Sequence, residues 1–179
     1  MTLSKNKTEE IPTKILIVGL DNSGKTSIVY SLKGIKNITT FSAIRPTRGE
    51  DPSNIEVLNS KYVIWDLGGQ EAYREAYLLK ISEYLENTSK IIFVIDIQDT
   101  NRYDEALDYM KQFVNSMKES MDFSIFLHKY DPGLEYNDKL NEEVISELIR
   151  KLKTFIPSKF FYSIFKTSIY AVFEKTSVT

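Results

Sequence analysis

The stretch GLDNSGKTS, residues 19–27, directly follows the apolar run KILIV, residues 14–18. It fits G-x-x-x-x-G-K-[ST], the pattern of a phosphate-binding loop that lies between a strand and a helix. The backbone N–H groups of the loop are expected to surround a β-phosphate at the positive end of that helix. Lys25 would reach the β- and γ-phosphates, and the Thr26 hydroxyl would bind Mg²⁺. The residues expected at the phosphates are Asp21, Asn22, Ser23, Gly24, Lys25, Thr26 and Ser27.

The bulk properties indicate one soluble domain. The chain has 179 residues, 42% hydrophobic and 27% charged, which suffices for a substantial core. A net charge of −2 argues against nucleic acid and anionic lipid as partners, and the absence of cysteine excludes thiolate chemistry. Residues 1–13 form a polar tail without a signal core, Thr2 excludes myristoylation, and no apolar run is long enough to span a membrane. We expect a cytoplasmic protein that has no intrinsic membrane anchor and reaches membranes only peripherally, through partners.

Apolar runs of strand length alternate with helical patterns along the chain. The runs are residues 14–20, 61–67, 90–96, 123–129 and 160–168. Apolar residues at helical spacing fill 103–117 and 140–152, and Pro157 ends the second helix. Residues 54–59 precede 61–67 with only a short turn between, which predicts an antiparallel hairpin at the sheet edge. The whole pattern predicts an α/β fold, with a mostly parallel six-stranded sheet, one antiparallel edge strand and helices on both faces.

A second motif, WDLGGQE, covers residues 65–71 at the end of a predicted buried strand. Asp66 is placed as a carboxylate that holds Mg²⁺ through water. The glycines let the backbone approach a γ-phosphate closely, with the Gly69 N–H as donor. Gln70 follows and is able to orient a water for in-line attack, so we expect it to be catalytic.

The phosphate loop alone leaves ATP and GTP open, and the motif HKYD, residues 128–131, decides between them. Asp131 would accept hydrogen bonds from the ring N–H and the exocyclic amine of guanine, a pair of donors that adenine lacks. Lys129 would lay its aliphatic stem along the base. These residues predict GTP and GDP, with Mg²⁺, as the ligands.

With these motifs the chain resembles the small GTPases of the Ras superfamily over nearly its whole length. GLDNSGKT, WDLGGQ and PTRG (residues 46–49) are similar to the Arf family, whereas HKYD and TSIY (residues 167–170) are similar to the Rag family. The resemblance implies that His128, where an asparagine is more usual, braces the phosphate loop through one ring nitrogen. It also implies that Ser168 and Ile169 offer backbone contacts to the guanine O6.

The same resemblance places the first switch in residues 46–49. Thr47 is expected to supply the second Mg²⁺ hydroxyl and to sense the γ-phosphate, with Thr39 and Thr40 as alternatives. Arg45 and Arg48 flank it, and either an arginine finger supplied by the chain itself or solvated charges for partner recognition would explain them.

The end of the chain departs from the pattern of these relatives. They follow the last strand with a long helix, whereas only AVFEKTSVT follows Tyr170 here. We expect a domain over residues 14–179 with a shortened C-terminal helix. The uncovered sheet face would then bind a second copy or a partner protein.

The motifs together predict a GTP-binding molecular switch that hydrolyses GTP slowly and regulates signalling or trafficking. By resemblance, its partners are an exchange factor, an activating protein and effectors. A GTP-bound scaffold subunit of a heterodimer that scarcely hydrolyses GTP is the alternative. A P-loop kinase for a small molecule has less support, because it leaves HKYD unexplained.

Overall fold

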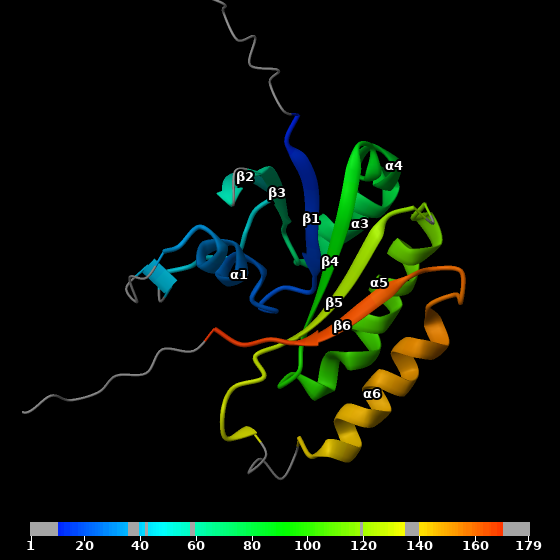
Figure 1. Cartoon of the computed structure of the whole chain (residues 1–179). Coiled ribbons are helices and arrows are strands. Elements are labelled where there is room, and N and C mark those ends of the chain that lie inside the picture. The colour runs from blue at the N-terminus through cyan, green and yellow to red at the C-terminus, as the bar shows by residue number, and fades with distance from the viewer. Residues whose placement is uncertain are drawn as a thin grey trace, which may run out of the picture.

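The computed structural model describes residues 11–35, 40–41, 43–57, 60–118, 120–134 and 140–169 (Figure 1). Its strands are β1 (Thr13–Gly19), β2 (Glu50–Val57), β3 (Ser60–Leu67), β4 (Thr88–Asp96), β5 (Asp122–His128) and β6 (Tyr162–Lys166). Its helices are α1 (Lys25–Leu32), α3 (Glu71–Leu79), α4 (Ile81–Leu85), α5 (Tyr103–Ser116) and α6 (Glu142–Phe155), with a short 3₁₀ turn, η1 (Thr100–Arg102). The predicted C-terminal helix and most of the predicted polar tail lie outside the described residues.

The six strands form one sheet in the order β2-β3-β1-β4-β5-β6. β2 pairs antiparallel with β3, and every other neighbouring pair is parallel. The predicted α/β fold with one antiparallel edge strand is therefore confirmed. Pro52 fits within β2 because an edge strand does not need every backbone N–H for pairing.

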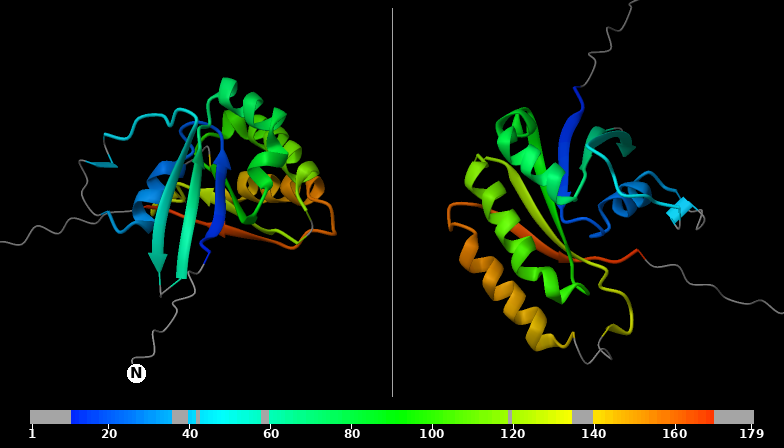
Figure 2. Two further views of the ribbon diagram at one scale, coloured as in Figure 1. Left: turned by 90° about the horizontal axis from the view of Figure 1, so that it is seen from above. Right: turned by 180° about the vertical axis from the view of Figure 1, so that it is seen from behind.

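Helices cover the two faces of the sheet unequally. Of the described helices, α1 lies on one face, and α3, α4, α5 and α6 lie on the other (Figures 1 and 2). The larger core lies under those four helices and includes Phe93, Phe113 and Phe123, all fully buried. The face under α1 holds a smaller, mostly aliphatic core that includes Ile17 and Val94. This asymmetry leaves the far end of the α1 face thinly covered.

The long helices follow from the sequence pattern. α5 turns seven apolar or aromatic side chains into the core, from Tyr103 to Val114. α6 begins where the Asn141 side chain accepts a hydrogen bond of 3.0 Å from the Val144 N–H, a helix cap that stabilises the first turn. In the described part of the chain, no helix is long and apolar enough to cross a bilayer.

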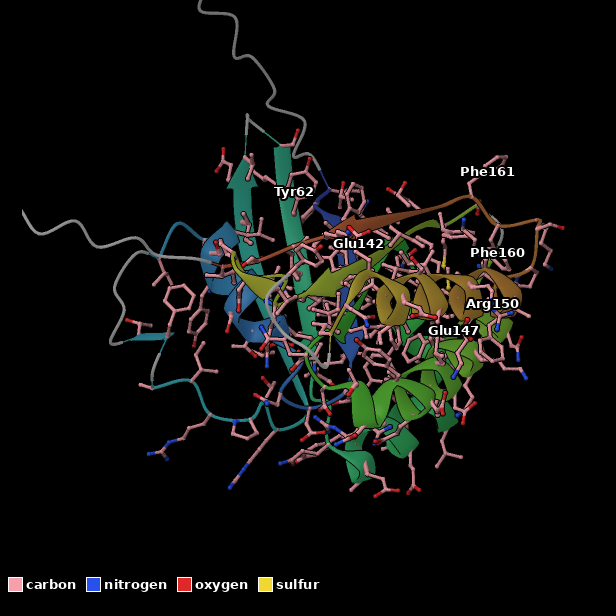
Figure 3. All side chains as sticks on the ribbon, turned by 90° about the horizontal axis from the view of Figure 1, so that it is seen from below. Tyr62, Glu142, Glu147, Arg150, Phe160 and Phe161 are labelled. Atoms are coloured by element: carbon pink, nitrogen blue, oxygen red, sulfur yellow. The ribbon has the colours of Figure 1, made fainter. Side chains whose placement is uncertain are left out.

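Phenylalanine side chains are exposed along the outer strands of the α1 face. Phe126 of β5 and Phe165 of β6 are paired in register and make an edge-to-face contact with ring centroids 5.7 Å apart. Phe165 is 47% exposed and Phe161, just before β6, is 90% exposed, whereas Phe160 is 5% exposed. Figure 3 shows the Phe161 side chain projecting away from the ribbon. We call Phe126, Phe161 and Phe165 the phenylalanine strip.

Candidate guanine-nucleotide site

The phosphate loop connects β1 to α1 at the carboxyl edge of the sheet, where ligand sites of parallel sheets lie. Gly24, with φ of +92°, directly precedes α1, and Asn22 also has a positive φ, +59°. The amides of Asn22 and Gly24 make no backbone hydrogen bond to another described residue. The first N–H groups of α1 lack helical acceptors in any case. The loop therefore presents several free donors, as an anion requires.

Ser23 differs from its neighbours because its side chain turns back into the fold. It is 1% exposed, and its Oγ has no hydrogen-bond partner within the described residues. A Cβ built on Gly19 would lie 3.2 Å from that oxygen. Only the backbone of Ser23 is thus placed for a phosphate.

Lys25 is held inside the curve of the loop. Its Nζ donates to the carbonyl oxygens of Leu20, at 2.7 Å, and Gly19, at 3.1 Å. Burial lowers the pKa of Lys25 to about 8, partly offset by the negative charges of Asp66 and Asp21. The ammonium is therefore poorly compensated until an anion arrives.

The three predicted magnesium ligands meet at one point. The Thr26 and Thr47 hydroxyl oxygens are 3.0 Å apart, and the Asp66 Oδ2 accepts from Thr26 at 2.5 Å and from Thr47 at 3.1 Å. Ligands 2.0–2.1 Å from Mg²⁺ at right angles are about 2.9 Å apart, so the two hydroxyls have the spacing of adjacent ligands. Burial raises the pKa of Asp66, and its Oδ1 has no partner among the described residues. A hydrated cation would supply the missing interactions, so these residues fit the ion.

A cavity lies between the phosphate loop and residues 44–47. Its lining comprises Asp21, Asn22, Gly24, Lys25, Thr26, Ser27, Ile44, Arg45, Pro46, Thr47, Gly69 and Gln70. Gln70 is exposed on its rim at the start of α3. Thr40 and Arg48 line a neighbouring groove instead. The structure thus brings Thr47 and Arg45 to the phosphate side, while Thr39 lies outside the described residues.

Gly69 touches the phosphate loop through its backbone. Its carbonyl oxygen accepts a 3.0 Å hydrogen bond from the Asp21 N–H. A Cβ built on Gly69 would lie 2.2 Å from the Asp21 nitrogen and 2.3 Å from the Leu20 carbonyl carbon. Only glycine fits this contact.

The residues predicted to bind the base gather after β5 and β6. One Asp131 oxygen accepts from the Ser168 hydroxyl, and the other accepts at 3.0 Å from the Gln98 side-chain amide. Lys129 has a φ of +61°, and its ammonium pairs with Asp96 at 2.7 Å. Asp131 is therefore oriented from two sides. Ile169, 37% exposed, follows Ser168.

His128 connects this group to the phosphate loop by packing. Its ring is 3% exposed, and its Nδ1 lies 3.0 Å from the Thr167 hydroxyl oxygen. Burial, aided by the Lys129 charge, lowers the pKa of His128, which favours the neutral ring. A Cβ on Gly24 would lie 2.4 Å from the ring Cδ2. The expected hydrogen bond from the ring to the phosphate loop is not among the described contacts, and close packing takes its place.

Two polar residues of the site escaped the sequence reasoning. Gln98 binds Asp131, and Arg102 pairs with Asp21 at 2.7 Å. Both follow β4, and polar residues after the carboxyl end of a parallel strand were the available signal.

The family model of the ADP-ribosylation factor family matches residues 1–171. Among solved structures, the chain is similar to the Arl6 BBS3 small GTPase from Trypanosoma brucei with a bound nucleotide analogue, GppNp. That match has 21% identity, covers 88% of this chain and 87% of the other, and has a TM-score of 0.67. The mammalian SRP receptor matches with 19% identity over 87% of this chain and 90% of that one, with a TM-score of 0.66.

The fold and family define a P-loop small GTPase, a class that binds guanine nucleotide and works as a GTP-dependent switch. The chain belongs to the ADP-ribosylation factor family. The Rag-like character of residues 128–131 and 167–170 stays a prediction.

Lys25 makes nucleotide binding dependent on pH. Because its pKa is lowered to about 8, the ammonium is fully present at pH 6.5 and is lost as the pH rises through 8. Phosphates stabilise the charged form, so binding of GDP at pH 8 should take up about half a proton at this site. Calorimetry in two buffers of different ionisation enthalpy measures this uptake at each pH. At pH 6.5 Lys25 should contribute no uptake, so that any net proton change there comes from the nucleotide phosphate, whose second pKa is about 6. No uptake at pH 8 would contradict the prediction.

Proposed function

We propose that the protein binds GTP with Mg²⁺, hydrolyses it slowly to GDP and phosphate, and binds effectors in the GTP state. The observation that carries this proposal is the meeting of Thr26, Thr47 and Asp66 beside the cavity that Gln70 borders. Thr47 reaches this point from the segment before β2, so a γ-phosphate and its cation would draw that segment to the phosphate loop. Loss of the γ-phosphate would release it.

The residues of the chain divide the work of hydrolysis. Lys25 and the free amides of the loop bind the β- and γ-phosphates and stabilise charge in the transition state. Thr26 and Thr47 would hold Mg²⁺ directly and Asp66 would hold it through water, and the bound ion would supply positive charge at the β- and γ-phosphates. Gln70 orients a water whose oxygen bonds to the γ-phosphorus while the bond to the β,γ-bridging oxygen breaks. The electron pair stays on the GDP oxygen, and the water proton leaves with the phosphate.

Base choice rests on Asp131. In the proposed complex its two oxygens, already oriented by Ser168 and Gln98, accept from the two guanine donors. Each carboxylate oxygen has lone pairs for both partners. Adenine lacks both donors and would leave the base-facing lone pairs of the carboxylate without a partner, a type of mismatch that enzymes reject strongly.

Asp131→Asn should weaken GTP binding and admit xanthosine triphosphate, whose C2 carbonyl oxygen accepts from an amide donor where guanine has its exocyclic amine. The wild-type protein should prefer GTP over ATP by more than about 10⁴, because adenine offers neither of the two donors that guanine presents to Asp131. Titration calorimetry with GTP, ATP and xanthosine triphosphate measures both. Comparable affinities of the wild-type protein for ATP and GTP would refute the assignment of Asp131.

Gln70→Leu should leave the affinity for a GTP analogue within a few-fold while hydrolysis falls by orders of magnitude, about 10² or more, because the contact exists only in the transition state. Gln112→Leu, at an exposed position on α5, is the matched control. Single-turnover assays, alone and with an activating protein, give the rates. Unchanged turnover in Gln70→Leu would contradict the catalytic role of Gln70 and make Arg45 the next candidate. Absence of hydrolysis in the wild-type protein would favour the alternative, a GTP-bound scaffold subunit of a heterodimer.

We also propose that a second copy of this chain covers the phenylalanine strip. β6 pairs only with β5 in the described sheet, so its outer edge offers unpaired backbone groups next to exposed Phe161 and Phe165. An edge strand pairs antiparallel with its own copy, which makes a two-fold, self-complementary contact.

Sedimentation of the chain in GDP and in a GTP analogue tests the proposed dimer. Phe161→Ser with Phe165→Ser should give a monomer, whereas Leu79→Ser, at a residue 87% exposed on α3, should not change the association. A monomeric wild-type protein in both nucleotide states would overturn the proposal.

A further inference from the structure

The phosphate loop contains a negative charge at an unfavourable place. Asp21 lines the cavity together with Lys25 and Thr26. Any phosphate bound there would be repelled by the Asp21 carboxylate, and the repulsion grows with the charge of the nucleotide. The charge therefore needs a partner that does not occupy the phosphate position.

Arg102 is that partner, and it approaches Asp21 from η1 without being among the residues that line the phosphate cavity. Its Nη1 donates to Asp21 Oδ1 at 2.7 Å, and its Nη2 lies 3.3 Å from the Asp21 carbonyl oxygen. Its Nε donates at 2.6 Å to Asp99, three residues earlier, which fixes the orientation of the guanidinium. Arginine is suited to this role because its planar fork binds two acceptors at once.

Asp21 also contacts Gly69, in the turn before α3 that would lie next to the γ-phosphate. Its backbone N–H donates to the Gly69 carbonyl oxygen at 3.0 Å. One residue thus joins Arg102, the phosphate loop and the turn before α3.

We infer that Arg102 is a positioning residue that neutralises Asp21 and holds the phosphate loop against Gly69, so that it sets the preference for GTP over GDP. The inference rests on the proposed function. Without Arg102, the free carboxylate would repel GTP more than GDP, because the γ-phosphate adds negative charge next to it. A merely structural brace would weaken both nucleotides equally.

The variants Arg102→Ala, Asp21→Asn and the double variant test this inference. Displacement of a fluorescent guanine nucleotide by GDP and by a non-hydrolysable GTP analogue gives the affinities, and Arg150→Ala, in the exposed pair with Glu147 on α6, is the control. Arg102→Ala should weaken the GTP analogue about tenfold more than GDP, a loss in the range expected for an unpaired charge. Adding Asp21→Asn should remove most of this extra loss for the GTP analogue, because the repelling charge is then absent.

Two results would overturn the inference. One is an equal loss for both nucleotides in Arg102→Ala, and the other is a double variant with no better discrimination than Arg102→Ala. If Arg102→Ala does not fold, Arg102→Lys keeps the charge but loses the fork and should retain most of the preference for GTP. Failure of the wild-type protein to bind either nucleotide would instead refute the proposed function itself.

Discussion

The backbone of the phosphate loop lies in direct contact with two other loops, at the two glycines Gly24 and Gly69. At Gly24 the neighbour is the His128 ring, and at Gly69 it is the backbone of Leu20 and Asp21. A Cβ at either position would overlap these atoms, since real Cβ contacts are not shorter than about 3 Å. The base side, the phosphate loop and the turn before α3 are therefore held at fixed spacing. The positions of Asp131, Lys25 and Gln70 relative to one another depend on those two contacts.

Lys25 and Asp66 are two buried groups of opposite charge within this site. Burial lowers the pKa of Lys25 and raises the pKa of Asp66, so each group is less favourable in its charged form than it would be in water. Phosphate would stabilise the first and a cation the second. The cost of burying both charges is then recovered only when nucleotide and cation bind together, which couples the two ligands without any direct contact between Lys25 and Asp66.

Much of the architecture was readable from the sequence because strand burial and helix amphipathicity leave periodic patterns. Five apolar runs predicted β1, β3, β4, β5 and β6, and the short turn after residues 54–59 predicted the hairpin that contains β2. The motifs also predicted that Thr47 acts together with Thr26 and Asp66, and their side-chain oxygens meet in the structure. No helix was predicted between residues 71 and 85, where the structure has α3 and α4 on either side of Lys80. Contacts between distant loops were also missed. Arg102 and Asp21 are 81 positions apart, and a charged residue in a loop gives no sign of its partner.

The sequence did not predict which side chains at the start of β6 are exposed, because the cause is geometric. Phe160 and Phe161 are chemically identical neighbours, and only the first enters the core. Composition indicates how much apolar surface a segment carries, whereas the direction of each side chain depends on where the strand begins. The sequence predicted the strand over residues 160–168, and the structure begins it at Tyr162.

The face of the sheet that α1 covers has few buried helix contacts, and this favours local unfolding of α1. α1 has eight residues, and Ile28 and Val29 are the apolar side chains that it buries, whereas α5 buries seven. Elements with so few buried contacts exchange their amide hydrogens through local opening, well before global unfolding. A nucleotide seated on the first turn of α1 would add about 4 kcal/mol to its stability when free ligand exceeds the dissociation constant about a thousandfold. The bound nucleotide would then contribute to the tertiary structure around α1, and the stability of this helix would depend on the concentration of free nucleotide.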